Sequence, residues 1–444
     1  MQQFLIWLGV ILLGLIILVP YVRRFRRQQH TTAERKKEAR ALGIDRPRSQ
    51  YPMIDRSVCI GCGSCVAACP EGDVLGVVWG VAEVINWERC VGHGYCETAC
   101  PVGAMKVGLG DVTSRPDIPI LSSCNETGVP GIFIAGELGG LSLIRHAVAQ
   151  GKMVVDEIAG RLHGPSHDDL YDIVIVGAGP AGLTAGLAAT QHRLKYMLLD
   201  ARDVGGTILH YPRQKLVMTQ PVDIPLYGRL TKEEYSKELL LDIWQAITEQ
   251  FRLNVRAGEC VESVTWNGSA FDVRTVSNSY LARYVVLAMG RRGTPRKLEV
   301  PGEELAKVTY QLMDAQSYQG KRMLVVGGGD SAVEAAVGLA RQPGNDVTIS
   351  YRKSGFFRVK KKNEEAVTRM IAARKLKALF ESQVVEIRPE SVLLGTPPGQ
   401  VELPNDFVIV QIGGLPPFDM LKKMGIAFGG DTRSFREFDF ALKT

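Results

Sequence analysis

This 444-residue sequence lacks charged residues at its N-terminus and has few cysteines after position 100. Its first 22 residues carry no charged side chain, although 23% of all residues are charged. Seven of its nine cysteines lie between positions 59 and 100, and only Cys124 and Cys260 follow. The hydrophobic fraction of 45% excludes an intrinsically disordered chain. A chain of this length has room for about two to four domains.

The uncharged N-terminus predicts a transmembrane anchor over residues 1–22. Phe4–Val22 is nearly all apolar, and as a helix it would reach about 28 Å, close to the hydrocarbon thickness of a bilayer. A cleaved signal peptide would begin with basic residues and end in small ones, and the sequence offers neither. A buried soluble helix would not be apolar on every face and then stop at four arginines.

Basic residues dominate the segment that follows, 23–51, which we expect to be a linker or a partly helical stalk. Residues 23–48 hold ten basic and three acidic side chains, a net charge of +7 against +6 for the whole chain. The remainder is therefore nearly neutral, which excludes a nucleic-acid binder. The basic excess predicts a single-pass protein of the inner (cytoplasmic) membrane, with its soluble domains facing the cytoplasm and anionic membrane lipid as a partner.

The early cysteines have the spacing of an iron–sulfur ligand loop. The run Cys59-x2-Cys62-x2-Cys65-x3-Cys69-Pro70 packs four thiols into eleven residues. Structural zinc sites usually present pairs of cysteines far apart. A disulfide framework does not suit the reducing cytosol. Three cysteines at steps of three can wrap one cube of iron and sulfide, because the glycines between them allow tight turns.

Residues 52–108 resemble a bacterial two-cluster ferredoxin, with MIDRSVCIGCGSCVAACP and INWERCVGHGYCETACPVGAM as its two halves. The resemblance implies two [4Fe-4S] clusters. Cluster I would take Cys59, Cys62, Cys65 and Cys100, and cluster II would take Cys69, Cys90 and Cys96. The fourth cysteine of the second half is missing, and His93 stands there. Imidazole is a competent iron ligand, so we expect His93 to complete cluster II. A three-iron cluster, or a water-ligated iron with His93 merely adjacent, remain alternatives.

The motif YDIVIVGAGPAGLTAG at 171–186 predicts a dinucleotide-binding fold. The apolar strand 173–176 runs into Gly177, Gly179 and Gly182 and then into a helix, which is the context that gives a G-x-G-x-x-G motif its meaning. The three glycines allow the turn, the approach of a pyrophosphate and the packing of helix on strand. The next strand, 195–199, ends in Asp200, where a carboxylate can bind a ribose hydroxyl.

A second motif, MLVVGGGDSAVEAAVGLA at 323–340, has Gly327, Gly329 and Ala332 in the three places, with Asp330 and Ser331 between them. Its next strand, 347–350, ends in Tyr351-Arg352-Lys353 and not in an acid. Cations at that edge suit the 2′-phosphate of NADP(H). If they form only a solvated basic face, the choice between NADPH and NADH stays open.

Two such units in one chain resemble the thioredoxin-reductase-like flavoproteins, which implies FAD at the first and NADPH at the second. Gly205-Gly206-Thr207 follows the FAD strand as in that family, 285–303 closes the first part of the FAD domain, and 407–426 returns to it. The expected fold class is α/β, with two Rossmann-like domains, a small α+β ferredoxin-like domain and one transmembrane helix. The expected ranges are 166–296 for the FAD domain, 297–412 for the NAD(P)H domain and 413–444 for the return.

The family's last segment, a strand with an A-G-D motif and a helix facing the flavin, does not follow the NADPH domain here. A matching segment, 109–165, precedes the first glycine motif. It contains the strand 131–135, then Gly136 and Glu137, and an amphipathic helix from about 142. Glu137 replaces the family's aspartate. We expect a circular permutation in which this segment joins the FAD domain.

The C-x-x-C disulfide of thioredoxin reductases is absent from 308–322. Reduction of a thioredoxin therefore has no carrier. The sequence predicts an enzyme, a membrane-anchored NAD(P)H-dependent, FAD-containing oxidoreductase that passes electrons between NADPH, FAD and the clusters, to or from a redox protein or a small molecule. No general base is expected. The alternatives are a reductase of low-molecular-weight disulfides and a non-catalytic, membrane-tethered redox sensor. The resemblance also implies a homodimer as one expected partner.

Overall fold

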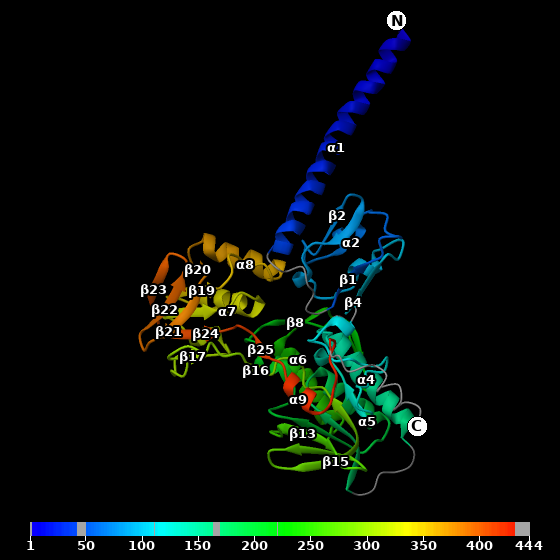
Figure 1. Cartoon of the computed structure of the whole chain (residues 1–444), viewed down its shortest axis with the longest axis vertical. Coiled ribbons are helices and arrows are strands. Elements are labelled where there is room, and N and C mark those ends of the chain that lie inside the picture. Colours follow the sequence, from blue (N-terminus) through cyan, green and yellow to red (C-terminus); the bar gives the residue numbers. More distant parts are fainter. Residues whose placement is uncertain (1, 42–49, 111, 163–168, 220, 431–444) are drawn as a thin grey trace. The chain divides into compact units, whose positions relative to one another are not determined.

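The computed structural model describes residues 2–41, 50–110, 112–162, 169–219 and 221–430 (Figure 1). It divides into two compact units, residues 1–110 and 111–444. The first unit carries the N-terminal helix and the cysteine-rich domain, and the second carries both glycine motifs.

Helix α1 (Gln2–Ala41) runs without a break through the predicted anchor and most of the predicted basic linker. Its C-terminal half packs against the cysteine-rich domain. The Trp79 backbone N–H donates to Gln29 Oε1 over 2.6 Å, Arg35 pairs with Asp73 at 2.6 Å, and Lys36 pairs with Glu83. Among the described residues, no helix combines the length and the apolar character needed to cross a membrane.

The cysteine-rich domain consists of two antiparallel strand pairs and two short helices. Strand β1 pairs with β4, and β2 pairs with β3. Its core contains Cys65 and Cys96 among apolar side chains, so the cysteines are part of the packing. The elements are β1 (Tyr51–Ile54), α2 (Ser64–Ala68), β2 (Leu75–Val78), β3 (Val81–Val84), the 3₁₀ turn η1 (Trp87–Arg89), α3 (Tyr95–Thr98) and β4 (Met105–Gly108).

The first glycine motif lies in a sheet with the strand order β12-β7-β6-β15-β14-β13. Strand β6 is buried over Ile173–Val176, as the apolar run predicts, and helix α5 follows it directly. The elements are β6 (Leu170–Val176), α5 (Pro180–Gln191), β7 (Tyr196–Asp200), η4 (Gly206–His210), β8 (Leu216–Met218), β9 (Val222–Ile224), β10 (Gly228–Leu230), β11 (Glu234–Ser236), α6 (Lys237–Gln250), β12 (Val255–Ala257), β13 (Val261–Trp266), β14 (Phe271–Thr275) and β15 (Ser279–Leu287).

The segment that precedes the first glycine motif is built into the same sheet. Strand β5 (Ile132–Ile134) pairs in parallel with the end of β15. Helix α4 (Ile144–Arg161) packs closely on α5, because a Cβ at Gly151 would lie 2.2 Å from the Ala181 carbonyl oxygen. The strand that the sequence predicts at 131–135 therefore has a sheet to join, as expected for a displaced part of the FAD domain.

The second glycine motif lies in a parallel sheet with the order β17-β24-β18-β19-β20, beside a three-stranded antiparallel sheet β21-β22-β23. The elements are β16 (Thr294–Pro295), β17 (Val308–Thr309), β18 (Arg322–Val326), α7 (Asp330–Ala340), β19 (Asp346–Tyr351), α8 (Lys361–Ala372), β20 (Lys377–Phe380), β21 (Gln383–Ile387), β22 (Ser391–Thr396), β23 (Gly399–Pro404), β24 (Phe407–Val410) and β25 (Gly414–Leu415).

The chain then returns to the first sheet. Helix α9 (Phe418–Lys423) buries Leu421 in the core that contains β5 and β6. The Ile120 N–H donates to the Ala427 carbonyl over 2.9 Å, so the return segment runs beside the start of the displaced segment. The predicted return over 413–444 is thus seen as far as residue 430, and 431–444 lie outside the described residues.

Candidate functional site

The first glycine loop has the tight geometry that a dinucleotide site needs. Gly177 has φ 107°, and a Cβ there would lie 2.6 Å from the Ala288 carbonyl oxygen. A Cβ at Gly182 would lie 1.7 Å from the Gly177 oxygen, so helix and loop approach as closely as the backbone allows. Gly179 precedes α5 and faces Gly206, with open space otherwise. The helix N-terminus is left accessible to a phosphate.

Asp200 stands where the sequence predicts it, at the carboxyl end of β7 beside the glycine loop. Its Oδ2 accepts from the Ala178 N–H over 2.6 Å, and its Oδ1 accepts from the Arg202 N–H over 2.9 Å. The Gly205 N–H donates to the Ala178 carbonyl over 2.9 Å, which brings the Gly205-Gly206-Thr207 turn to the same loop. These predicted FAD-binding residues therefore gather at one edge of the sheet.

Gly136 and Glu137 of the displaced segment reach the same edge. A Cβ at Gly136 would lie 3.0 Å from the Ala181 Cβ, and the Gly136 N–H donates to Gln150 Oε1 over 2.8 Å. Burial raises the pKa of Glu137, and the positive charge of Arg291 and Arg292 partly opposes it. Glu137 is thus a half-buried acid facing cations, beside the loop that would hold the pyrophosphate.

Sequence reasoning missed a group of titratable side chains around Glu137. Burial raises the pKa of Tyr211 to about 12, and the charge of Glu137 adds to the shift. Burial lowers the pKa of His210 to about 4, helped by Arg202 and Arg292. Burial also lowers the pKa of Arg292. Such a cluster is typical of a cofactor pocket. The available signal for it was the pair Arg291-Arg292, which follows β15 after three residues.

The second glycine loop repeats this arrangement. Gly327 has φ 142°, and a Cβ there would lie 2.3 Å from the Gln411 carbonyl oxygen. Ala332 is fully buried against the sheet. Asp330 begins α7 and its Oδ1 accepts from the Lys360 N–H and from Asn363 Nδ2, at 3.0 and 2.7 Å. Ser331 is exposed beside it.

Arg352 and Lys353 follow β19 at the edge where this loop lies. The Gly327 N–H donates to the Ser350 carbonyl over 3.0 Å, two residues before Arg352. Arg352 is exposed and Lys353 is half-buried. The predicted cations are therefore brought to the end of the strand where a ribose phosphate would lie.

The two cysteine loops share one backbone geometry, with each residue of the first matched 31 positions later in the second. Cys62 lies between Gly61 (φ 64°) and Gly63 (φ 79°), and His93 lies between Gly92 (φ 79°) and Gly94 (φ 83°). Gly63 caps α2 and Gly94 caps α3 with nearly identical dihedral angles. His93 therefore occupies the place of Cys62 in the second loop. Its ring stacks on that of Tyr95, with centroids 5.4 Å apart.

Two sets of cysteines lie close enough to influence one another, Cys59 with Cys62 and Cys65, and Cys69 with Cys90 and Cys96. Burial raises the pKa of Cys65, and the nearby thiolates of Cys59 and Cys62 raise it further. Burial likewise raises the pKa of Cys90 to about 11, with added repulsion from Cys96 and Cys69. Cys69, from the first motif, thus faces the cysteines of the second.

The donor set fits iron–sulfur clusters. Backbone N–H groups point at two of the sulfurs, from Ala82 to Cys59 Sγ over 3.4 Å and from Ala104 to Cys100 Sγ over 3.2 Å. Such bonds tune cluster potentials. In the described part of the chain, no three histidine, cysteine or acidic side chains converge on one metal ion. A cube binds each thiolate at a different iron, so its ligands stand further apart than those of one ion.

The two remaining cysteines do not form a pair. Cys260 is exposed, and Cys124 is half-buried with Arg161 Nη2 at 3.7 Å from its Sγ. All nine cysteines are free thiols.

Several reductases are similar to this chain. The chain is 29% identical over 268 residues to a ferredoxin–NADP reductase of Ignicoccus hospitalis, covering 59% of this chain and 83% of that one. It is 32% identical over 191 residues to a ferredoxin–NADP reductase of Streptococcus pneumoniae, covering 42% of this chain but only 56% of that one. The bacillithiol disulfide reductase of Bacillus cereus matches with a TM-score of 0.54 and 25% identity, over 59% of this chain and 83% of that one.

Two family assignments complete the comparison. Residues 51–101 match a 4Fe-4S dicluster domain, which confirms the predicted ferredoxin domain. Residues 174–437, more than half of the chain, match the pyridine nucleotide-disulphide oxidoreductases. The predicted class of enzyme, an NAD(P)H-dependent, FAD-containing oxidoreductase, is confirmed. The chain belongs to the pyridine nucleotide-disulphide oxidoreductase family and carries a 4Fe-4S dicluster domain before it.

Proposed function

We propose that the protein is a membrane-anchored oxidoreductase that passes electrons between NADPH and two [4Fe-4S] clusters through FAD. The observation that carries this proposal is the presence of two dinucleotide loops and a dicluster domain on one chain. The names of its relatives, ferredoxin–NADP reductase, support it, because they couple a ferredoxin with NADP. Here the ferredoxin-like domain is part of the same chain.

FAD would be held by the first glycine loop, Asp200, the Gly205-Gly206-Thr207 turn and Glu137. This site would thereby gain a group that can take up two electrons from NADPH and give them up singly. Gly179 and the N-terminus of α5 would bind the pyrophosphate, and Asp200 a ribose hydroxyl. Arg292 and Glu137 would fix the charge around the flavin, since burial lowers the pKa of Arg292 and raises that of Glu137.

NADP(H) would be held by the second loop, with Gly327, Gly329 and Ala332 under the pyrophosphate and Arg352 with Lys353 at the 2′-phosphate. We expect Arg352→Ala to raise the KM for NADPH about tenfold, the loss of one charge-assisted contact, with little effect on NADH. The control is Lys375→Ala, an exposed cation two residues before β20. Equal losses for both nucleotides would contradict the role of Arg352.

The clusters would be held as the sequence implies. Cluster I would use Cys59, Cys62, Cys65 and Cys100, and cluster II would use Cys69, Cys90, Cys96 and His93. The position of His93 between two left-handed glycines, equivalent to that of Cys62, supports it as the fourth ligand. A neutral imidazole in place of a thiolate would make cluster II the better electron acceptor.

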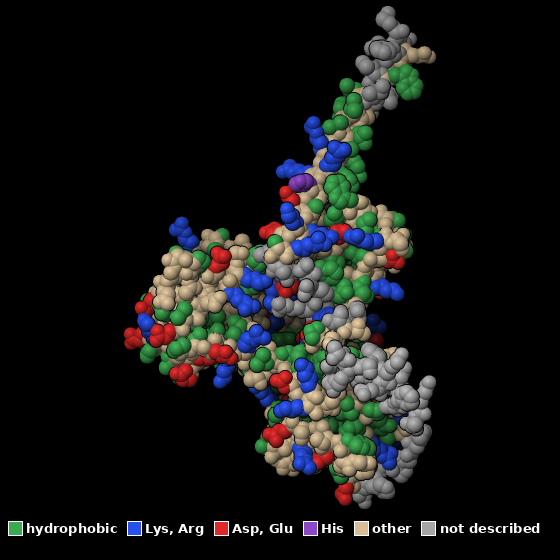
Figure 2. All heavy atoms as spheres, in the orientation of Figure 1, with side chains coloured by type: hydrophobic (Ala, Val, Ile, Leu, Met, Phe, Trp, Pro, Cys, Tyr) green, Lys and Arg blue, Asp and Glu red, His purple; other side chains and the backbone are tan. Residues whose placement is uncertain are grey.

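The proposed anchor is the first part of α1. Its described side chains from Trp7 to Phe25 are largely apolar and exposed, with Trp7 and Ile17 each 66% exposed. Figure 2 shows basic side chains gathering where this apolar stretch ends. We expect the full chain to pellet with membranes and to bind anionic vesicles, and a chain lacking residues 1–22 to stay in solution. Recovery of the full chain in the soluble fraction without detergent would contradict the anchor.

The order of the FAD domain along the chain supports a circular permutation. Strand β5 pairs with β15, and the return segment runs beside residue 120 at the start of the displaced segment. In the usual order of the family, the displaced segment would directly follow the return segment along the chain. Joining residue 430 to residue 117 and beginning the chain at 169 would restore that order, and we expect such a protein to bind FAD.

Anaerobic rapid mixing with NADPH tests the proposed route. We expect the flavin absorbance to bleach first and the broad cluster absorbance to follow. If the flavin is reduced while the cluster absorbance stays unchanged, the route is wrong. The second candidate, reduction of a low-molecular-weight disulfide, is favoured by Cys124 beside Arg161. Disulfide-driven NADPH oxidation that Cys124→Ser abolishes would establish it.

A further inference from the structure

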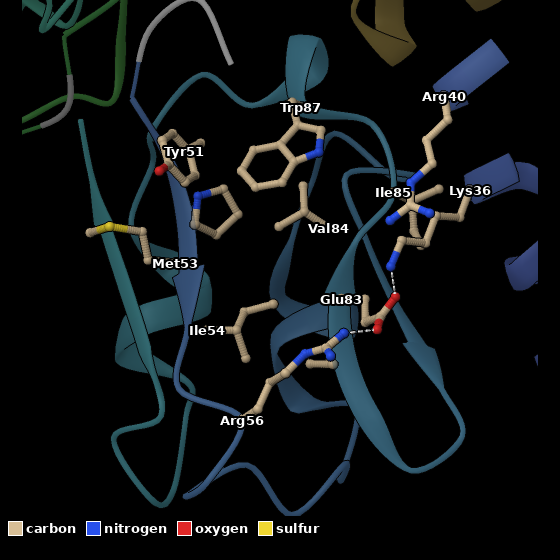
Figure 3. A pocket seen from close by; sticks show the side chains of 12 residues that line it. Lys36, Arg40, Tyr51, Met53, Ile54, Arg56, Glu83, Val84, Ile85 and Trp87 are labelled. Carbon is tan, nitrogen blue, oxygen red and sulfur yellow. Dashed lines mark hydrogen bonds and ion pairs between the residues drawn. The ribbon is translucent and has the colours of Figure 1, made fainter. Parts of the chain in front are cut away.

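A pocket of about 360 Å³ lies in the first unit, between the C-terminal part of α1 and the strands of the dicluster domain. Figure 3 shows side chains from α1, β1, β3 and η1 pointing into it. Its volume is at the lower end of the range for small-molecule sites, about 300–1,000 Å³. The pocket therefore suits a small ligand, about the size of two fused six-membered rings.

One wall of the pocket is aromatic and aliphatic. Tyr51 and Trp87 meet edge to face with their ring centroids 4.7 Å apart. Met53, Ile54 and Val84 complete this wall. Such a surface binds a flat, apolar ring through its faces and edges.

The opposite side is cationic. Glu83 forms ion pairs with both Lys36 and Arg56, which neutralise its negative charge. Arg40 forms no ion pair with the described residues, and its side chain lines the same pocket. Three cations against one carboxylate favour a ligand whose oxygens accept hydrogen bonds and gain negative charge.

The pocket touches residues that contact ligands of both proposed clusters. Ala82 lines it and donates its N–H to Cys59 Sγ over 3.4 Å. Trp87 also lines it, and its carbonyl accepts the Cys90 N–H over 3.2 Å. A molecule in the pocket would thus be one residue away from a ligand of each cluster, where an electron acceptor belongs.

We propose that this pocket binds a quinone-class electron acceptor, a planar ring with two carbonyl oxygens, as the terminal acceptor of the enzyme. The inference rests on the proposed function. The balanced reaction is NADPH + H⁺ + quinone → NADP⁺ + hydroquinone, in which the quinone gains two electrons and two protons. NADPH supplies both electrons and one proton, and the second proton comes from water at the pocket mouth. Arg40 stabilises the oxygen that becomes negative, and Tyr51 with Trp87 holds the ring.

Other ligands fit the pocket less well. Among the described residues, no glycine lines it, so those residues offer no backbone cradle for the phosphates of a nucleotide. Its one carboxylate is already paired with two cations, which leaves no site for a metal ion. An anionic head group would use the cations but leave the aromatic wall without a partner.

The test measures steady-state reduction of menadione by NADPH, with ferricyanide as the matched acceptor, on the full chain in detergent. We expect Arg40→Ala to raise the KM for menadione several-fold, up to about tenfold, because one charge-assisted contact is lost. Ile54→Trp, which fills the pocket, is expected to raise it at least as much. The control variant is Lys106→Ala, an exposed cation of β4 that does not line the pocket. Ferricyanide reduction is expected to be unchanged in all three.

Unchanged KM values for menadione in Arg40→Ala and Ile54→Trp would overturn the inference, since menadione would then be reduced elsewhere. Failure of NADPH to reduce ferricyanide in the wild type would overturn the proposed function instead. Equilibrium dialysis of menadione against the oxidised protein tests whether the pocket binds a quinone, independently of turnover. Binding that Arg40→Ala weakens supports it. Binding of glycerol phosphate without binding of menadione would overturn it in favour of an anionic head group.

Discussion

The two cysteine loops of the dicluster domain have matching glycine dihedral angles and differ at one proposed ligand, Cys62 in the first and His93 in the second. Cys62 and His93 each lie between two glycines with positive φ, directly before a short helix. The surroundings differ as well, because the Cys62 Sγ lies 3.4 Å from Ser64 Oγ, whereas His93 stacks on Tyr95. Within one domain, therefore, the fold holds two equivalent loop positions, which we propose to be ligand positions, and the sequence changes the chemistry of one. This difference would separate the potentials of the two clusters.

The largest expected effect comes from removing one buried cysteine in each half. Cys65 is 6% exposed and Cys96 is 8% exposed. Water therefore has little access to take the place of either thiolate as an iron ligand. We expect Cys65→Ala to lose cluster I and Cys96→Ala to lose cluster II, each removing about half of the bound iron. Iron analysis of the purified variants measures this. If one variant keeps as much iron as the wild type while the other loses half, the two halves are not equivalent.

Exchanging the differing ligands is the sharper change. His93→Cys should lower the potential of cluster II, and Cys62→His should raise that of cluster I, each by on the order of a hundred millivolts or more, because a thiolate charge is gained or lost. Redox titration followed by electron paramagnetic resonance measures both.

The exchange has a clear control. His93→Ala should convert cluster II to a three-iron form or leave one iron open to water. If His93→Ala and His93→Cys leave both the potential and the spectrum of cluster II unchanged, His93 is not a ligand.

The glycines before the two positions should differ in stability. A Cβ at Gly61 would lie 2.0 Å from the Gly80 carbonyl oxygen, which is backbone and cannot move freely. The three atoms nearest to a Cβ at Gly92 all belong to the Gln50 side chain, the first at 1.9 Å. Both substitutions force alanine into a positive φ, at a cost of about 1–2 kcal/mol. Gly61→Ala should therefore lower the thermal midpoint more than Gly92→Ala, and the reverse order in anaerobic thermal unfolding would contradict the packing.

The smallest expected effect concerns the neighbour of each ligand. The Ser64 hydroxyl, through its hydrogen bond, lowers the pKa of Cys62. Ser64→Ala removes this bond, so the potential of cluster I should fall slightly, since hydrogen bonds to sulfur favour the reduced cluster. Tyr95→Phe is the matched control in the other half, because it keeps the ring that stacks on His93. A larger shift from Tyr95→Phe than from Ser64→Ala would contradict this view.

Much of the site could be predicted from the sequence because its motifs are local. The spacing of Cys59–Cys69 and the glycine loops at 177–182 and 327–332 each fix geometry within a few residues. The boundaries were less accurate: the strand expected at 347–350 is Asp346–Tyr351, and the helix expected from 142 begins at Ile144. Hydrogen bonding at the ends of elements, which residue patterns do not show, decides such limits.

Other features depend on contacts between distant segments and could not be predicted. The titratable group of Glu137, Tyr211 and Arg292 comes from three separate segments. The pocket beside the clusters needs α1 to pack on the dicluster domain, which follows from pairs such as Lys36–Glu83. The equivalence of His93 and Cys62 was suggested by spacing, but its strength comes from the matched glycine dihedral angles.

The most direct test of the account is an anaerobic titration of the reconstituted full chain with NADPH, followed by electron paramagnetic resonance. The account predicts signals of reduced iron–sulfur clusters, with cluster II reduced before cluster I. In His93→Cys this order of reduction should be reversed or lost. Complete reduction of the flavin with no cluster signal at any NADPH concentration would contradict it.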